Sequence, residues 1–283
     1  MFGSGFGYSS IPENWGSDHW DIAAVRGPLT AKILGLPEGK AVIDGAALLA
    51  KLPEFSPVPD ADRLEVLFVP HHEAMAVQEW QSACDKAGVT LLDPRGDSVE
   101  VIQRLRHAKL VIADSMHAAI ISDVLRVPWI PVMSSKQIST FKWLDWAMSL
   151  SVPYEPVRLH HPSIDSAVFS HTLPLIGQAH SVTPPTPEKA LEHLKAMMTP
   201  LSEAEREASY RRKWKLHDRP LKWVRDSRSK RVTSTIDSRW TDATARQLQA
   251  LAGRKGYLSD MAVIRSKTEE LYDRFRRVIT AYA

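Results

Sequence analysis

The chain has 283 residues, of which 44% are hydrophobic and 24% are charged. This is about twice the usual length of one domain, so the length predicts two domains or one domain with a large appendage. The composition excludes collagen-like and wholly disordered chains, and a single cysteine, Cys84, excludes an internal disulfide. The N-terminus has no leader-like pattern and no apolar run reaches about 18 residues, so we expect a cytoplasmic protein.

The formal net charge of +3 is the sum of two unlike parts. Residues 1–200 contain 16 Lys and Arg against 22 Asp and Glu, which gives a net charge of −6. Residues 201–283 contain 20 against 11, which gives a net charge of +9. The sequence therefore predicts a mildly acidic body followed by a basic tail.

The first 62 residues combine a glycine-rich turn with short elements. A strand is predicted over Ile22–Val25, and Arg26-Gly27-Pro28 opens a helix over Leu29–Leu34. Three prolines and two aspartates within 52–62 are typical of a linker. We therefore predict a domain boundary at about residue 62.

Residues 63–157 alternate between apolar runs and helical patterns, which predicts a parallel sheet covered by helices. Asp97 and Glu100 have the spacing of a capping box, and Gly88 that of a helix C-cap. We predict a doubly wound α/β domain with right-handed crossovers. The expected strands are 64–69, 89–92, 110–113 and 129–133, and the expected helices are 73–87, one from 97 onward, and 115–126.

Beyond this domain the sequence predicts a connector and a helical extension. Residues 158–200 are expected to be irregular apart from a helix that begins at Pro187 and runs through Met198. Residues 201–283 are expected to form basic helices. Two of these are predicted at 203–215 and at 258–282, where apolar residues recur at about helical spacing.

Parallel α/β proteins bind ligands beyond the carboxyl ends of their strands, where helix N-termini offer free N–H groups and partial positive charge. An imidazole at the first turn of a helix, beside hydroxyls, suits an anionic molecule that needs a proton. The rule selects the residues that follow the four strands, namely His71 and His72, Arg95 and Gly96, Asp114, Ser115 and His117, and Ser134, Ser135 and Lys136.

Each candidate also has a purely structural interpretation. His117 could cap or pack at its helix start, and the His71-His72 pair could form a solvated turn. Arg95, in a Pro-Arg-Gly turn, could be an ordinary surface charge. Arg26 could fork onto a carboxylate or phosphate, or form a salt bridge at a helix start.

Two further patterns carry less information. The glycine-rich segment 3–7 lacks the preceding strand that a dinucleotide fingerprint requires. We predict no metal site, because the histidines of the connector have no cysteine or carboxylate at ligand spacing. These histidines are His160, His161, His171 and His180.

Three passages in about the first 150 residues carry a family resemblance. They are GSGFGY at 3–8, WDIAAVRGPLTAKILGLP at 20–37 and ADSMHAAIISDVLRVPWIPV at 113–132. The chain resembles the polysaccharide pyruvyl transferase family, most closely the branch that adds pyruvate ketals to exopolysaccharides of the succinoglycan type. The third passage is the most specific, because its Ser-Met-His is similar to the motif of that branch.

The resemblance implies a fold similar to GT-B glycosyltransferases, with two Rossmann-like domains facing each other across a cleft. It implies phosphoenolpyruvate as the donor, no further cofactor, and a hexose of a lipid-linked oligosaccharide at the cytoplasmic face of the membrane as the acceptor. His117 would then supply a proton to the methylene carbon of the donor, and Arg26 and Arg95 would hold its carboxylate and phosphate. The other expected substrate-binding residues are Ser115, Met116, His71, His72, Gly3, Ser4 and Gly5.

The chain departs from the family at both ends. Members usually have strands, helices and an Asn-Phe-Gly-Asp-like turn before the GSGFGY passage, so 1–62 is interpreted as the remnant of a first domain. Either the start of the chain is assigned too late, or the chain is an N-terminally truncated relative. Residues 206–231 contain 11 Lys and Arg against 3 Asp and Glu, interleaved with Tyr210, Trp214 and Trp223. Such a segment can be a solvated or partner-docking face, lie on an anionic membrane, or bind nucleic acid, for which no motif is present.

The leading hypothesis is a pyruvyl transferase that forms ketals during exopolysaccharide assembly. One alternative is a GT-B glycosyltransferase, because the phosphates of a nucleotide sugar would use the same helix N-termini. The other is a truncated, non-catalytic partner in polysaccharide assembly.

Overall fold

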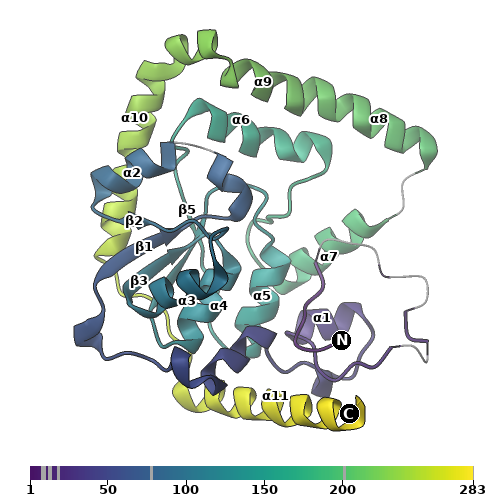
Figure 1. Ribbon diagram of the computed structural model, residues 1–283. Helices are drawn as coiled ribbons and strands as arrows, with labels where there is room; N and C mark the ends of the chain where they lie inside the picture. The colour runs from purple at the N-terminus through teal and green to yellow at the C-terminus, as the bar shows by residue number, and fades with distance from the viewer. Residues whose placement is uncertain (8–10, 12–14, 18–19, 77–78, 200–201, 283) are drawn as a thin grey trace.

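The computed structural model describes residues 1–7, 11, 15–17, 20–76, 79–199 and 202–282, without the side chains of 76 and 227–232. At its centre is a five-stranded, all-parallel sheet in the order β2-β1-β3-β4-β5 (Figure 1). The predicted α/β class and parallel sheet are confirmed, and a short fifth strand joins the four that were expected. The strands are β1 Glu65–Val69, β2 Thr90–Leu91, β3 Ala108–Ala113, β4 Trp129–Met133 and β5 Val157–Arg158.

Side chains alternate between the two faces of the sheet, as the pleat requires. On β1, Leu67 and Val69 belong to one buried cluster, whereas Phe68 belongs to the other. Helices α2 (Glu79–Ala87) and α10 (Ser227–Ala252) supply residues to the Phe68 cluster, and α3, α4 and α5 supply residues to the other cluster. The sheet is therefore covered on both faces. Helices α3, α4 and α5 span Ser98–Arg106, Met116–Val124 and Thr140–Ser149, respectively.

The strand order places a topological switch point between β1 and β3. The chain runs outward from β1 to β2 on one side and from β3 to β5 on the other. At such a point the connections leave the sheet in opposite directions, which opens a crevice outside the carboxyl ends of the two strands. The candidate histidines follow these two strands.

The helix predicted over 73–87 includes residues 77–78, which lie outside the described residues. On either side the structure has a 3-10 turn, His72–Ala76, and the helix α2. Asp97 caps α3 as predicted, because its carboxylate accepts hydrogen bonds from the backbone N–H groups of Val99 and Glu100 at 3.0 Å. Tyr8, the last residue of the GSGFGY passage, also lies outside the described residues.

Residues 1–62 pack directly against the sheet domain. The strand predicted at 22–25 is present only as single parallel bridges of Val25 to Ser4 and Ala41, and helix α1 follows at Pro28–Ile33. Phe6 and Phe55 are buried in the same hydrophobic cluster as Trp129 of β4. The GT-B arrangement of two facing domains stays a prediction.

The connector is more ordered than its sequence indicated. It contains α6 (Ile164–Thr172), a 3-10 turn (Leu173–Ile176) and α7, which spans the predicted Pro187–Met198. Helix α6 begins at Ser163, whose side chain accepts a hydrogen bond from the Ser166 N–H.

The C-terminal helices divide into an outer pair and two that join the core. Helices α8 (Glu203–Lys213) and α9 (Arg219–Arg225), joined by a π-helical turn, lie along the outside beyond α6 (Figure 1). Leu248 and Leu251 of α10 are buried against the sheet, and α11 (Met261–Tyr282) buries Leu271. The expected helices are present, but α10 and α11 are integral to the core because their apolar faces point inward. Among the helices that the structure describes, none is both long enough and apolar enough to span a bilayer.

Candidate active site

A pocket of about 170 Å³ lies at the switch point between β1 and β3. Five of the residues singled out in the sequence as substrate-binding or catalytic line it, which means that residues following β1 and β3 meet there. Helix α5 and the turn before it complete the wall. The lining residues are His71, His72, Asp114, Ser115, Met116, His117, Ile138, Ser139, Lys142 and Trp143.

Asp114 joins the ends of three strands beneath the pocket. Its fully buried carboxylate accepts hydrogen bonds from the His71 N–H at 2.9 Å, the Ser134 N–H at 2.9 Å and the Ser134 hydroxyl at 2.6 Å. Burial raises the pKa of Asp114, and these hydrogen bonds oppose that shift. Asp114 thus fixes where the backbone leaves β1 and β4.

His71 is held with one ring nitrogen inside the protein. Its Nδ1 is buried and has no hydrogen-bond partner among the described residues. Desolvation, together with electrostatic repulsion by the nearby ionisable groups of His72, Lys142 and His180, lowers the pKa of His71 to about 4. At neutral pH this side chain is therefore an uncharged hydrogen-bonding group, packed 4.2 Å from the His72 ring.

The first turn of α4 forms another wall of the pocket. Ser115 is the N-cap residue, yet its hydroxyl makes no capping bond within the described structure. Met116 and His117 follow in the first turn, where backbone N–H groups have no intrahelical acceptor and the helix dipole is positive. His117 is exposed at the pocket, so its ring can reach a bound molecule.

The pKa of His117 is lowered from its ordinary value. The largest cause is desolvation, Asp44 opposes the shift, and the positive charges of Arg26 and Lys142 add to it. These surroundings bias the imidazole toward its neutral form. Negative charge brought by a ligand would offset the two cations and raise the pKa.

Lys142 is the charged pocket residue that sequence reasoning missed, and Ile138, Ser139 and Trp143 are the other lining residues that it did not single out. Lys142 lies on α5, and desolvation and the neighbouring Arg26 lower the pKa of its ammonium group to about 8, against an opposing effect of Asp44. Below that pH it brings a full positive charge into the pocket. Its signal in the sequence is a single cation within the otherwise apolar run Phe141–Leu144.

Arg26 lies behind the pocket in a buried network. Its Nε donates to the Asp145 carboxylate at 3.0 Å and its Nη2 to the Phe6 carbonyl at 3.3 Å. Asp145 also accepts from the N–H and hydroxyl of Thr30, at 2.8 and 2.6 Å. Two nitrogens of Arg26 thus already have protein partners, and its charge reaches the pocket through its effects on the pKa values of His117 and Lys142.

Gly3, Ser4 and Gly5 run beside the strand-like segment that ends in Arg26 and are not among the described lining residues. The Gly3 N–H bonds to the Ala24 carbonyl, and the Ser4 carbonyl accepts from the Arg26 N–H, both at 3.0 Å. A Cβ atom on Gly5 would lie 2.1 Å from Cζ of Arg26, so only glycine allows this approach. Ser4 and Gly5 thus contact Arg26 directly, and Gly3 is bonded to the segment just before it.

Arg95 is placed away from the pocket lining. Its half-exposed guanidinium bonds to Asp93 two residues earlier, with its Nη2 2.6 Å from Oδ2. The turn after β2 therefore presents an ion pair to solvent. No described lining residue comes from this turn.

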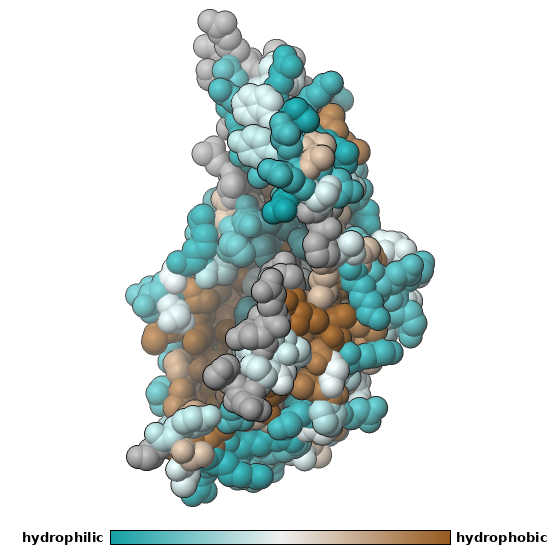
Figure 2. Space-filling model, turned by 90° about the vertical axis from the view of Figure 1, so that its right-hand side faces the viewer, coloured by the Kyte–Doolittle hydropathy of each residue, from teal (hydrophilic) through white to brown (hydrophobic). Residues whose placement is uncertain are grey.

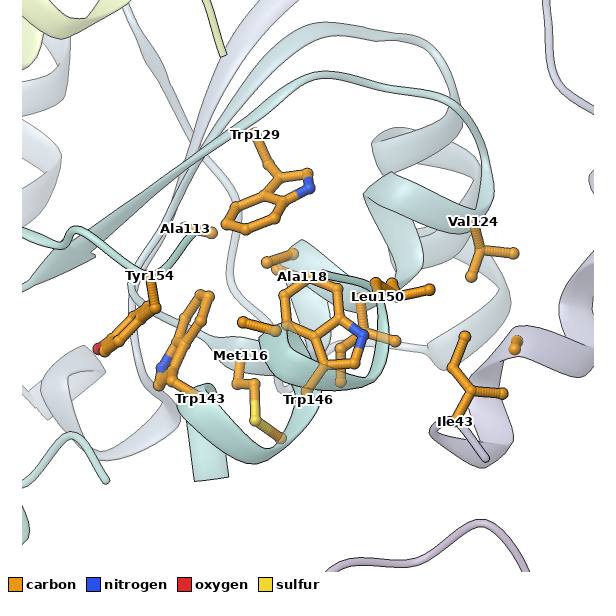
Figure 3. Close-up of a cluster of buried hydrophobic side chains, with 14 of the residues drawn as sticks. Ile43, Ala113, Met116, Ala118, Val124, Trp129, Trp143, Trp146, Leu150 and Tyr154 are labelled. Atoms are coloured by element: carbon orange, nitrogen blue, oxygen red, sulfur yellow. The ribbon is translucent and has the colours of Figure 1, made fainter. Parts of the chain in front are cut away.

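Aromatic packing supports the pocket from below. Trp143 lines the pocket and stacks on Tyr154, with ring centroids 5.2 Å apart and an interplanar angle of 18° (Figure 3). Trp146, one turn along α5, packs against Trp129 of β4 at 5.0 Å. These rings anchor α5, and with it Lys142, against the sheet.

The arrangement is suited to an anion. Asp114 is the one carboxylate among the described lining residues, and the protein already occupies its oxygens. Lys142, a helix N-terminus and three imidazoles face the same space. The described residues contain no group of three or more His, Cys, Asp or Glu side chains that could hold a metal ion.

The fold is that of a doubly wound α/β protein, and the lining of the pocket at its switch point is suited to an anion. Residues 17–136 match the family model of polysaccharide pyruvyl transferases. The succinoglycan biosynthesis protein ExoV of Rhizobium meliloti (strain 1021) is 42% identical over 159 residues, which cover 56% of this chain and 50% of that protein. Residues 17–136 are thus similar to polysaccharide pyruvyl transferases, and both matches agree with the resemblance found in the sequence.

The chain spans half the length of the curated relative that it matches. No solved structure matches it. The matched family segment contains Arg26, His71, Asp114 and His117 but ends before Lys142.

Proposed function

We propose that this protein transfers pyruvate from phosphoenolpyruvate to a hexose of an exopolysaccharide repeat, as a ketal. The observation that carries the proposal is the cationic pocket at the β1/β3 switch point, built largely from a pyruvyl transferase segment. The family description supports a polysaccharide acceptor, and the relative's name supports exopolysaccharide synthesis. A lipid-linked acceptor at the cytoplasmic face of the membrane is part of the proposal.

Phosphoenolpyruvate carries a carboxylate and a phosphate, and the pocket offers a donor group for each. The N–H groups at the start of α4 suit one anionic group, because the first turn offers them no intrahelical acceptor and they lie at the positive end of the helix dipole. Lys142 suits the other as a point charge. His71, uncharged at neutral pH, adds a hydrogen-bonding ring nitrogen.

The chemistry requires a proton at the methylene carbon. Transfer of the His117 proton to that carbon makes it a methyl group and leaves the adjacent carbon electron-poor. One sugar hydroxyl then adds to this carbon and loses its proton. Loss of phosphate regenerates the electron-poor carbon, and a second hydroxyl adds and loses its proton to close the ketal. Ketal formation consumes one proton, supplied by His117, and releases two, one from each sugar hydroxyl. One released proton offsets the proton consumed, and the other leaves with the phosphate or the solvent.

The pKa of His117 links proton transfer to donor binding. In the empty pocket, desolvation, Arg26 and Lys142 favour the neutral imidazole. The negative charges of phosphoenolpyruvate compensate both cations, which favours the imidazolium next to the donor. The proton is thus supplied mainly when the donor is present.

The test is acceptor-dependent release of phosphate from phosphoenolpyruvate. The acceptor is the lipid-linked oligosaccharide fraction of cells that lack this protein, so that its ketal sites are free. We expect release with the wild-type chain and a loss of about 10²- to 10⁴-fold in kcat for His117→Ala. His107→Ala, a change at a partly buried histidine outside the pocket, is the control and should retain activity.

Two results would count against the proposal. Normal turnover by His117→Ala, with folding verified by circular dichroism, would remove the proton donor from the account. Consumption of a nucleotide sugar in place of phosphoenolpyruvate would instead identify a glycosyltransferase.

A further inference from the structure

Helices α8 and α9 present aromatic side chains to solvent. Tyr210, Trp214 and Trp223 are 76%, 54% and 62% exposed, although large aromatic rings usually bury most of their area. They occupy α8, the π-helical turn and α9, which run along the outside of the molecule (Figure 1). Contacts with the described residues leave these three rings largely exposed.

The same helices have a separate inward face. His217, Leu221 and Val224 are buried, and α9 and the π-helical turn pack against α6. The His217 ring lies 5.6 Å from the Phe169 ring, and its Nδ1 is 2.5 Å from the Thr172 hydroxyl. The helices are thus attached by one side, and their exposed rings belong to the other.

Cations surround the exposed rings. Residues 206–226 contain 8 Lys and Arg against 3 Asp and Glu, and Arg212, Lys215, Arg219 and Lys222 are all exposed. Arg211 forms an ion pair with Glu207, in which Nη1 of Arg211 lies 3.3 Å from Oε1 of Glu207, and both side chains are well exposed. Figure 2 shows hydrophilic residues with paler ones between them over this upper end of the molecule.

We propose that this aromatic–cationic face, defined by Tyr210, Trp214, Trp223 and the exposed Lys and Arg between them, binds the surface of an anionic lipid bilayer. Charge complementarity draws the face to anionic headgroups. Trp and Tyr rings are favoured at the boundary between headgroups and acyl chains, where an apolar body and a polar N–H or O–H are both satisfied. Nucleic acid would account for the cations but is less suited to rings spread over three helical segments.

This inference goes beyond the proposed function, which it extends by bringing the enzyme to the surface that carries a lipid-linked acceptor. Binding is measured without donor or acceptor, so its failure is distinct from failure of the transferase proposal. The probe is a set of phosphatidylcholine vesicles with and without phosphatidylglycerol, sedimented with the full chain at low and high salt.

We expect binding to the phosphatidylglycerol vesicles only, weakened by salt. Trp214→Ala/Trp223→Ala and Lys215→Glu/Lys222→Glu should each lower the partition coefficient by about tenfold or more. The matched controls lie on α11, where Tyr282 is 73% exposed and Arg276 and Arg277 are exposed. Tyr282→Ala and Arg276→Glu/Arg277→Glu should bind like the wild type.

Three results would overturn the proposal. One is the absence of sedimentation with phosphatidylglycerol vesicles, and another is an equal loss of binding in the α11 controls. The third is equally tight binding of a duplex oligonucleotide at the same salt, combined with no effect of the Trp substitutions. That pattern would define a general polyanion surface.

Discussion

Lys142 determines how the pocket responds to an anion, because its charge can be present or absent near neutral pH. Desolvation and the positive charge of Arg26 disfavour the protonated amine and lower its pKa to about 8, against an opposing effect of Asp44. A bound dianion reverses that effect. Affinity for phosphoenolpyruvate should therefore depend on pH in a range where most lysines do not titrate.

The first prediction concerns this dependence. In His117→Ala, the Kd for phosphoenolpyruvate should change little between about pH 7 and 8, where its phosphate is a dianion, and rise above pH 8, as Lys142 loses its proton. Lys142→Gln should bind about 10- to 100-fold more weakly below pH 8 and lose the dependence. Isothermal titration calorimetry at several pH values measures both. A flat profile in the Lys142-containing protein would show that the amine does not hold the donor.

The sequence located most of the pocket but not all of it. His71, His72, Ser115, Met116 and His117 follow strand ends, so the rule for parallel sheets predicted where they lie. Lys142 lies in the first turn of α5, nine residues after the end of β4, so a rule applied to the residues directly after each strand did not reach it. Arg95 follows the end of a strand, as the rule requires, but its guanidinium is hydrogen-bonded to Asp93, two residues away.

Helix α5 is the element on which the site depends, because it carries Lys142 and Trp143 into the pocket and Asp145 into the Arg26 network. Its residues show little of the pattern that predicts a helix. Aromatic residues have modest helix propensity, and a helix buried on most sides lacks a clear apolar stripe. The two-residue strand β5 was missed for a simpler reason, since it is too short to show alternation.

The N-terminal passage supports α5 through close backbone approaches. Arg26 and Asp145 are 119 residues apart in the chain, and Gly5 and Gly27 allow the segments to meet. A Cβ atom on Gly27 would lie 1.9 Å from the Asp145 carbonyl oxygen. Such long-range contacts leave no periodic pattern, so the sequence indicates the glycines but not their partners.

The second prediction tests this support. Gly5→Ala would push the Arg26 guanidinium out of its buried ion pair, so we expect the free energy of unfolding to fall by about 1–3 kcal/mol. The Kd for phosphoenolpyruvate should also rise, because α5 loses a fixed partner. Thermal denaturation and calorimetry measure the two effects. Gly39→Ala is the control, since nothing lies within 4 Å of its added Cβ; equal effects in both variants would refute the specific role of Gly5.

At the scale of the whole molecule, the structure shows where the basic residues of the C-terminal part lie and how the first 62 residues pack. The basic residues that distinguish 201–283 lie partly on the aromatic–cationic face of α8 and α9, whereas α10 and α11 return to cover the core. The predicted break at about residue 62 is crossed by one continuous hydrophobic cluster that includes Phe6, Phe55 and Trp129. Composition predicted the linker, but burial of its apolar residues depends on the sheet that they meet.

The central claim is that the switch-point pocket protonates phosphoenolpyruvate and passes its pyruvate to a sugar. The most direct measurement is mass spectrometry of the oligosaccharide product formed from phosphoenolpyruvate in heavy water. We predict a ketal whose methyl group carries one solvent deuterium, formed by the wild type and reduced at least about 100-fold in His117→Ala. A ketal without solvent deuterium, or no ketal from phosphoenolpyruvate under conditions where a nucleotide sugar is consumed, would contradict the account.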